Sequence, residues 1–181
     1  MNNNYTILHL HSMDSNPKSG LTIDSVTPFQ DEILKAVECN MIAITFTEHG
    51  SVLHNVAKKQ MCDKYGIKYI HGQEFYVTEK IDKNNLVRDN YHLIMLAKNK
   101  DGVREINYLS SIANNRDDGH FYYTPRIELS DVLNTSDNVF IPLAKLERLP
   151  TFNFPSWFDS VLRFEVSVPI ALFASLADAL I

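Results

Sequence analysis

Short apolar runs alternate along the chain with segments in which apolar residues recur every three or four positions. A run rich in β-branched and aromatic residues predicts a buried strand, and the longer spacing predicts an amphipathic helix. The expected strands are residues 5–10, 41–46, 67–72, 74–79, 91–99 and 137–141, and the expected helices are 27–40, 51–66 and 103–113. Helices are therefore interspersed with strands along the chain.

Two of the expected helices carry clear end signals. Pro28 suits the first helical position, and Gln30 lies three residues after Thr27. We therefore expect Thr27 to cap the first helix in a capping box. Gly66 is expected to end the second helix, because a glycine often closes the last turn in a left-handed conformation.

This alternation favours parallel β/α units, which build an open doubly wound sheet or a barrel. The fold class is therefore α/β. In both architectures the residues that carry the chemistry gather at the carboxyl ends of the strands. Polar residues at strand ends are the first candidates for a functional site.

Composition narrows the class of protein. The 181 residues are 45% hydrophobic, and 22 acidic against 17 basic residues give a net charge of −5. Such a chain is poorly suited to gripping a phosphate backbone, so any DNA contact is expected to be indirect. Cys39 and Cys62 are expected to be structural thiols in a reducing compartment. No signal-peptide pattern opens the chain, which favours a cytoplasmic protein that does not enter the membrane.

Five residues at predicted strand boundaries form the candidate site. His9 and His11 lie two apart, so an extended backbone points both rings to one face. His49 follows the second strand, Glu74 follows the third, and His92 opens a later one. Imidazole and carboxylate ligands suit Zn²⁺, Mn²⁺ or Fe²⁺ better than Mg²⁺ or Ca²⁺. We interpret these five residues as metal ligands for one ion or more.

The other histidines and Glu48 have weaker claims. His54 is interpreted as a surface or groove residue, and His120 as a solvated loop residue. His71 is left either as a core residue or as one that supports a ligand. Glu48 could bind metal itself, but we favour a carboxylate that orients an imidazole.

Several sequence blocks occur in an order that resembles a known family. They read HLHS, IAITFTEHGSV, GIKYIHGQEFYV, YHLIMLAKNKDGVREINYLSS and GHFYYTPRI. Over about residues 5–141 the chain resembles the PHP (polymerase and histidinol phosphatase) domain at the N-terminus of bacterial DNA polymerase III alpha subunits. The resemblance implies a distorted (β/α)7 barrel, up to nine metal ligands, a trinuclear site and phosphoester hydrolysis.

Within this resemblance the five candidate ligands fall on the family's ligand positions. His9 and His11 match the first ligand pair, and His49 matches the histidine of the family's T-D-H-G. Glu74 matches the G-x-E carboxylate, and His92 matches the Y-H-L histidine.

The chain departs from the family at other ligand positions. Glu48 replaces the usual aspartate of T-D-H-G, and the family's third ligand falls near Ser19, which replaces it poorly. Asp14 and Asp24 are the alternatives for this ligand. The later ligands have no counterpart, because residues 121–181 contain neither histidine nor cysteine.

Residues 142–181 differ in character from the sequence before them. All six glycines and all seven histidines precede this segment, which holds four of the seven prolines. We expect residues 1–141 to be an incomplete PHP domain, truncated on its C-terminal side, followed by a divergent tail. An out-of-frame origin is one hypothesis, because a shifted reading across Leu143 and Ala144 can restore the cysteine that the family carries there.

Three functions remain open. The first is the PHP part of a polymerase III alpha-like subunit, with the rest of a replicative polymerase or a proofreading subunit as its partner. The second is a freestanding metal-dependent phosphoesterase, and the third is a non-catalytic structural or interaction module. Tyr122, Tyr123 and Arg126 could contact phosphate or a neighbouring domain, although a structural role at the surface is favoured.

Overall fold

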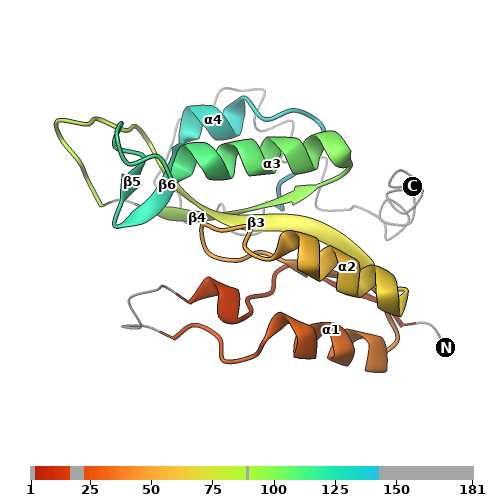
Figure 1. Cartoon of the computed structure of the whole chain (residues 1–181). Helices are drawn as coiled ribbons and strands as arrows, with labels where there is room; N and C mark the ends of the chain where they lie inside the picture. The colour runs from red at the N-terminus through yellow and green to blue at the C-terminus, as the bar shows by residue number, and fades with distance from the viewer. Residues whose placement is uncertain (1–2, 17–22, 89, 143–181) are drawn as a thin grey trace.

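The structure is a computed structural model that describes residues 3–16, 23–88 and 90–142 (Figure 1). Its strands are β1 (Asn3–Ile7), β2 (Met41–Phe46), β3 (Lys68–Thr78), β4 (Tyr91–Ala97), β5 (Phe121–Tyr122), β6 (Thr124–Glu128) and β7 (Val139–Phe140). Its helices are α1 (Phe29–Glu38), α2 (Asn55–Tyr65), α3 (Lys100–Ala113) and α4 (Leu129–Leu133), with a 3-10 turn η1 (Met13–Ser15). No helix in these ranges is long and apolar enough to cross a membrane. The predicted tail lies almost wholly outside the described residues.

The sheet is mixed, and β3 lies at its centre. β1, β2 and the first part of β3 pair in parallel, and β6 pairs in parallel with the end of β3. β4 is antiparallel to both β3 and β7, and β5 is antiparallel to β6. The α/β class is therefore confirmed, but purely parallel pairing is wrong. The described residues between β3 and β4 form no helix, and a return without a crossover makes neighbouring strands antiparallel.

β3 is one continuous strand, where the sequence predicted two strands separated by Gly72 and Gln73. Both residues stay extended because they pair with Leu96 and Met95 of β4. A Cβ atom on Gly72 would lie 2.6 Å from the Leu96 side chain, so this glycine permits close packing and does not make a turn. Side chains consequently alternate between the two faces along all of β3.

Two element ends differ from the prediction. β1 ends at Ile7, so the segment with His9 and His11 bends away after the strand and is not part of it. α1 begins at Phe29, with Pro28 at its N-cap position and no side-chain cap from Thr27. The Thr27 carbonyl instead accepts a hydrogen bond from the Met13 backbone N–H, which ties η1 to the start of α1. Gly66 ends α2 in the left-handed conformation, as predicted.

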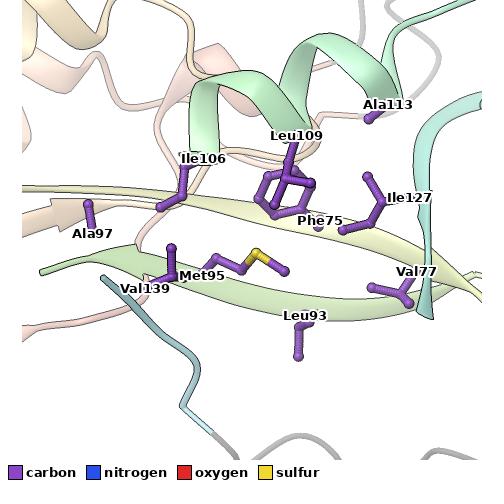
Figure 2. Close-up of a cluster of buried hydrophobic side chains, with 10 residues drawn as sticks. All are labelled: Phe75, Val77, Leu93, Met95, Ala97, Ile106, Leu109, Ala113, Ile127 and Val139. Atoms are coloured by element: carbon purple, nitrogen blue, oxygen red, sulfur yellow. The ribbon is translucent and has the colours of Figure 1, made fainter. Parts of the chain in front are cut away.

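Two apolar clusters hold the helices to the sheet. In Figure 1, β3 and β4 run between the α3–α4 pair and the α1–α2 pair. Ile106 and Leu109 of α3 pack with Phe75 and Met95 of the sheet (Figure 2). The second cluster joins α1 and α2 to β2 and β3 and consists of Phe29, Ile33, Ala36, Ile44, Phe46, Cys62, Ile67 and Tyr69. Because neighbours on a strand alternate, Glu74 and Tyr76 point away from the face that holds Phe75.

Gly102, in the first turn of α3, packs so closely against the backbone of Asn138 that no side chain fits there. A Cβ atom on Gly102 would lie 2.2 Å from the backbone carbonyl oxygen of Asn138. Replacing an unhindered glycine inside a helix with alanine raises the free energy of unfolding by about 1 kcal/mol. Here we expect Gly102→Ala to lower the free energy of unfolding by about 1–3 kcal/mol, because backbone must move to relieve the overlap. Urea denaturation measures this change, with exposed Ser111→Ala as the control in the same helix. A stabilised G102A variant would contradict the close contact.

Candidate metal centre

Four imidazoles surround the carboxylate of Glu74. His9 and His11 come from the segment after β1, and His49 follows β2. His92 is the second residue of β4 and lies opposite Tyr76 in the strand register. His49 itself forms a parallel bridge with Glu74, which places it beside the middle of β3. The structure thus brings together all five residues that the sequence predicted as ligands, while metal binding itself stays a prediction.

Each oxygen of Glu74 faces two imidazole nitrogens. Oε2 lies 3.4 Å from Nε2 of His9 and 3.2 Å from Nε2 of His11. Oε1 lies 3.5 Å from Nδ1 of His49 and 2.5 Å from Nδ1 of His92. The Nε2 atoms of His9 and His11 are 3.3 Å apart. Nitrogens from opposite sides of the carboxylate therefore converge on one small volume.

The polar atoms at this centre lack ordinary partners. Glu74 is only 1% exposed, yet among the described residues neither of its oxygens has a hydrogen bond of acceptable geometry. Nδ1 of His49 is unsatisfied in the same way. Buried polar atoms normally find hydrogen bonds, and a set of nitrogen and carboxylate donors that lacks them fits a divalent metal. The residues present therefore suit the divalent metal ion that the sequence predicted.

The protonation states also suit metal binding. Burial pushes the pKa of Glu74 upward, but the imidazoles of His11, His92 and His49 outweigh it and hold that pKa well below its usual range. Burial is the largest influence on the pKa of His49 and lowers it, against the opposite effect of Glu74. An ionised carboxylate and a neutral imidazole are the forms that bind a metal ion.

The ligand atoms form three overlapping groups, each with its atoms within 4.8 Å of one another. The groups are His9–His11–Glu74, His49–Glu74–His92 and His11–Asp24–His49. Oδ2 of Asp24 lies 3.4 Å from Nε2 of His49, so Asp24 is the one of the two alternative aspartates that reaches the centre. Asp14 instead contacts Lys58 and His54, each at 2.9 Å.

The hydroxyl group of Thr47 contacts Nδ1 of His9, the ring nitrogen that does not face Glu74. Oγ1 of Thr47 lies 3.0 Å from Nδ1 of His9 and 3.2 Å from the backbone N–H of Leu10. When the Thr47 hydroxyl directs its hydrogen to the Leu10 carbonyl, 3.4 Å away, its oxygen can accept a hydrogen bond from Nδ1 of His9. His9 then carries its proton on Nδ1 and presents the Nε2 lone pair to the centre.

Two other predicted site residues lie outside the ligand cluster. Glu48 is buried and contacts no imidazole directly, but it reaches His11 through the hydroxyl of Ser15. Arg126 is also buried, so the expected surface position is wrong. Its guanidinium donates to the carbonyls of Val87 and Gly119, which draws it inward.

The remaining histidines play no part in the ligand cluster. His54 occupies the N-cap position of α2 with a left-handed backbone and contacts Asp14. His120 lies 2.8 Å from a carboxylate oxygen of Asp118. His71 is on the face of β3 opposite Glu74, where its ring contacts Asn107 at 3.1 Å.

The buried ring of His71 predicts a loss of stability in acid. Burial lowers its pKa to about 4, although the hydrogen bond to Asn107 acts in the opposite direction. The unfolded chain, with the ordinary value of 6.5, therefore takes up this proton first as the pH falls. The neutral ring of His71 therefore contributes fully to the free energy of unfolding above about pH 6.5. This contribution falls by up to about 3 kcal/mol as the pH is lowered from about 6.5 to about 4.

Urea denaturation between these pH values tests the contribution of His71. A His71→Gln variant can keep the bond to Asn107 and should lose less stability in acid than the wild type. All the other ionisable groups are present in both proteins, so their contributions cancel in the comparison. Parallel pH profiles would contradict the assignment of the loss to His71.

Sequence reasoning missed Tyr76. Its ring stacks on His49 with centroids 5.8 Å apart and meets His92 edge-on at 4.8 Å. Burial raises its pKa, as do the charges of Glu74 and Asp24. Tyr76 lies two residues after Glu74, so the period of a continuous strand would have placed both on one face.

Comparison with known proteins identifies a family for most of the chain. The family model for the PHP domain matches residues 8–161. The DNA polymerase III subunit alpha of Borreliella burgdorferi is 36% identical over 136 residues, which are 73% of this chain and 11% of that protein. The subunit alpha of Chlamydia trachomatis is 34% identical over 125 residues, 67% of this chain and 9% of that protein.

A solved structure was also matched, from a Bifidobacterium adolescentis protein provisionally named a metal-dependent phosphoesterase. It has a TM-score of 0.39 and 11% identity, and the match covers 60% of this chain and 34% of that one. The chain spans about a tenth of the length of the curated relatives described above. It belongs to the PHP domain family and is homologous to a part of DNA polymerase III alpha subunits.

Proposed function

We propose that this chain is a metal-binding PHP module of a replicative polymerase lineage, with a centre of the phosphoesterase type. One observation carries the proposal: four imidazole nitrogens lie 2.5–3.5 Å from the two oxygens of the buried Glu74 carboxylate. One or two protonated imidazoles would be enough to neutralise a buried carboxylate. Four imidazole nitrogens around it are instead the ligand set expected of a centre that binds metal ions.

The two sides of Glu74 would hold different ions. His9, His11 and Oε2 of Glu74 would form one position, and His49, His92 and Oε1 would form the other. Asp24 would extend the cluster from its exposed side. Zn²⁺, Mn²⁺ and Fe²⁺ are the candidates for this donor set.

The chemistry supplied by bound ions would be activation of a water molecule and neutralisation of a phosphate during hydrolysis. The protein's part is to hold the ligands in fixed orientations, as Thr47 does for His9. Tyr76 packs against the rings of His49 and His92 and so restricts their orientations. Asp24 and His92 are the most exposed of the candidate ligands, with 41% and 45% of their side chains accessible, so a phosphoester would approach the centre past one of them.

The family context suggests the wider setting. The parallel run of β1, β2 and β3, continued by β6, supports a distorted (β/α)7 barrel of PHP type as the architecture of the domain. The rest of a replicative polymerase, or a proofreading subunit, is the proposed partner, and the cytoplasm is the proposed location. Contact with DNA would then be made mainly by that partner.

A non-catalytic role is the second candidate. Within the described part of the chain, no residue after His92 joins any of the ligand groups. A centre with fewer ligands than the family pattern could bind metal for stability alone, while the domain supports a neighbouring one.

Metal analysis with a hydrolysis assay separates these candidates. The full chain, stripped with a chelator, would be loaded separately with Zn²⁺, Mn²⁺ and Fe²⁺, and bound metal measured by mass spectrometry. Hydrolysis of an aryl phosphate monoester and a diester would be followed in parallel. We expect bound metal and turnover that both fall in a His92→Ala variant but persist in His54→Ala, which lies outside the cluster. Metal without turnover supports the non-catalytic module, and a folded chain that binds none of the ions contradicts the proposed centre.

A further inference from the structure

A buried ion pair lies behind the candidate metal centre. Lys58 of α2 is 1% exposed, and its Nζ atom lies 2.7 Å from Oε1 of Glu48. The same ammonium contacts Asp14 at 2.9 Å and donates to the Leu53 carbonyl at 3.1 Å. It also lies 4.8 Å from the centre of the Phe46 ring. Burying two charges costs free energy, so such a pair gives little evidence for stability and suggests a specific task.

We propose that Lys58 and Glu48 are positioning residues that determine which ring nitrogen of His11 carries the proton. The proposal rests on the metal centre above, because the proton position decides whether Nε2 of His11 is free to bind an ion. The effect is transmitted through the hydroxyl of Ser15.

Glu48 has no acceptor capacity left for a different arrangement. Oε1 receives the Ser12 hydroxyl at 2.6 Å and the ammonium of Lys58, and Oε2 receives the Ser12 backbone N–H at 3.0 Å and the Ser15 hydroxyl. A carboxylate has about four lone-pair sites and no proton to donate. All four partners of Glu48 must therefore be donors.

This requirement fixes the direction of the next hydrogen bonds. The Ser15 hydroxyl has one hydrogen, which it donates to Glu48, so toward other groups it can only accept. It accepts the backbone N–H of His49 at 3.2 Å and faces Nδ1 of His11 at 2.8 Å. His11 must then carry its proton on Nδ1, and its Nε2 lone pair points toward His9 and Glu74.

The same reasoning assigns His11 to one ligand group. Its Nδ1 atom lies 3.8 Å from Asp24, but that nitrogen is occupied by its proton. Its Nε2 atom lies 3.2 Å from Glu74 and is unprotonated. His11 therefore serves the group that contains His9 and Glu74, and not the group that contains Asp24.

Replacing Glu48 with glutamine should reverse this chain of hydrogen bonds. Lys58 and the Ser12 backbone N–H can both only donate, and the amide oxygen will face the charged ammonium of Lys58. The NH₂ group will then face Ser15, and the Ser12 N–H loses its acceptor. Ser15 must then accept from the amide and donate its own hydrogen to Nδ1 of His11. The proton of His11 moves to Nε2, and the metal-binding lone pair is lost.

The tautomer can be read directly in the full chain without metal. Long-range ¹H–¹⁵N NMR at about pH 8, where free imidazoles are neutral, distinguishes the two ring nitrogens of His11. We expect a proton on Nδ1 in the wild type and on Nε2 in Glu48→Gln, with zinc affinity about 10–100-fold weaker by calorimetry. Lys59→Met, which removes the neighbouring exposed lysine, should match the wild type.

A double variant tests the role of Lys58. In Glu48→Gln with Lys58→Met, no ammonium faces the amide, so its oxygen can turn toward Ser15 and the Ser12 backbone N–H. The proton should return to Nδ1 of His11, and zinc affinity should recover. A purely structural role for the ion pair would give further loss instead.

Ser15→Ala decides the question if Glu48→Gln does not fold, because it removes the relay and leaves the ion pair intact. We expect both tautomers of His11 to be populated in this variant. A proton that stays on Nδ1 in Ser15→Ala, or in a folded Glu48→Gln, overturns the proposal. A wild-type chain with the expected tautomer but without zinc binding contradicts the proposed function and leaves this inference standing.

Discussion

Glu74→Gln is expected to remove stable metal binding from the centre. Glutamine has the size of glutamate but lacks its charge, and one of its two terminal atoms becomes an NH₂ donor. Glu74 belongs to two of the three ligand groups, so both lose their shared anion. Loss of a residue that only supports a ligand weakens metal affinity by about 10–100-fold, and we expect at least the upper end of that range here.

Isothermal titration with Zn²⁺ and Mn²⁺ measures this loss, and circular dichroism establishes that the variant is folded. Glu38→Gln is the matched control, because its carboxylate is exposed at the end of α1 and pairs with Lys35. If folded E74Q binds zinc as tightly as the wild type, Glu74 is not a ligand, and the centre must be assigned differently.

Local signals predicted much of the secondary structure. The β-branched and aromatic run at 41–46 became β2, and Gly66 closed α2 through its left-handed backbone. Both features depend on residues within a few positions of one another. Local patterns therefore suffice where no distant partner decides the conformation.

Features that depend on distant partners were harder to predict. The continuity of β3 through Gly72 is set by β4, whose Leu96 side chain fills the space that a Cβ would need. The antiparallel direction of β4 depends on the course of the segment that precedes it. Neither the partner strand nor its direction can be read from the periodicity of β3 alone.

Some residues of the candidate site could be predicted from local sequence, and others could not. The spacing of His9 and His11 indicated a shared direction, and the structure places both rings beside Glu74. The choice between Asp14 and Asp24 could not be made from sequence, because it depends on the three-dimensional course of the loop between η1 and α1. In the structure a buried lysine on α2 engages Asp14, and that contact is invisible to local pattern.

Among the proposed substitutions, Phe75→Ala is expected to lower the free energy of unfolding the most. Phe75 is 1% exposed and lies in the cluster between β3, β4 and α3 (Figure 2). Replacing a buried phenylalanine with alanine typically costs about 3–5 kcal/mol, which is a large part of the stability of a domain of this size. Urea denaturation measures the loss, and Phe75→Leu, which leaves a smaller cavity, should retain more of the wild-type stability.

Metal should partly compensate for the cavity, because Phe75 and Glu74 are neighbours on β3 but face opposite sides of the sheet. A ligand that binds only the folded state at about 100 times its Kd adds about 2.7 kcal/mol to the free energy of unfolding. We expect zinc to add the same increment to Phe75→Leu as to the wild type, and none to Glu74→Gln. An increment that falls in F75L as well would show that the core and the centre do not behave as independent faces of one strand.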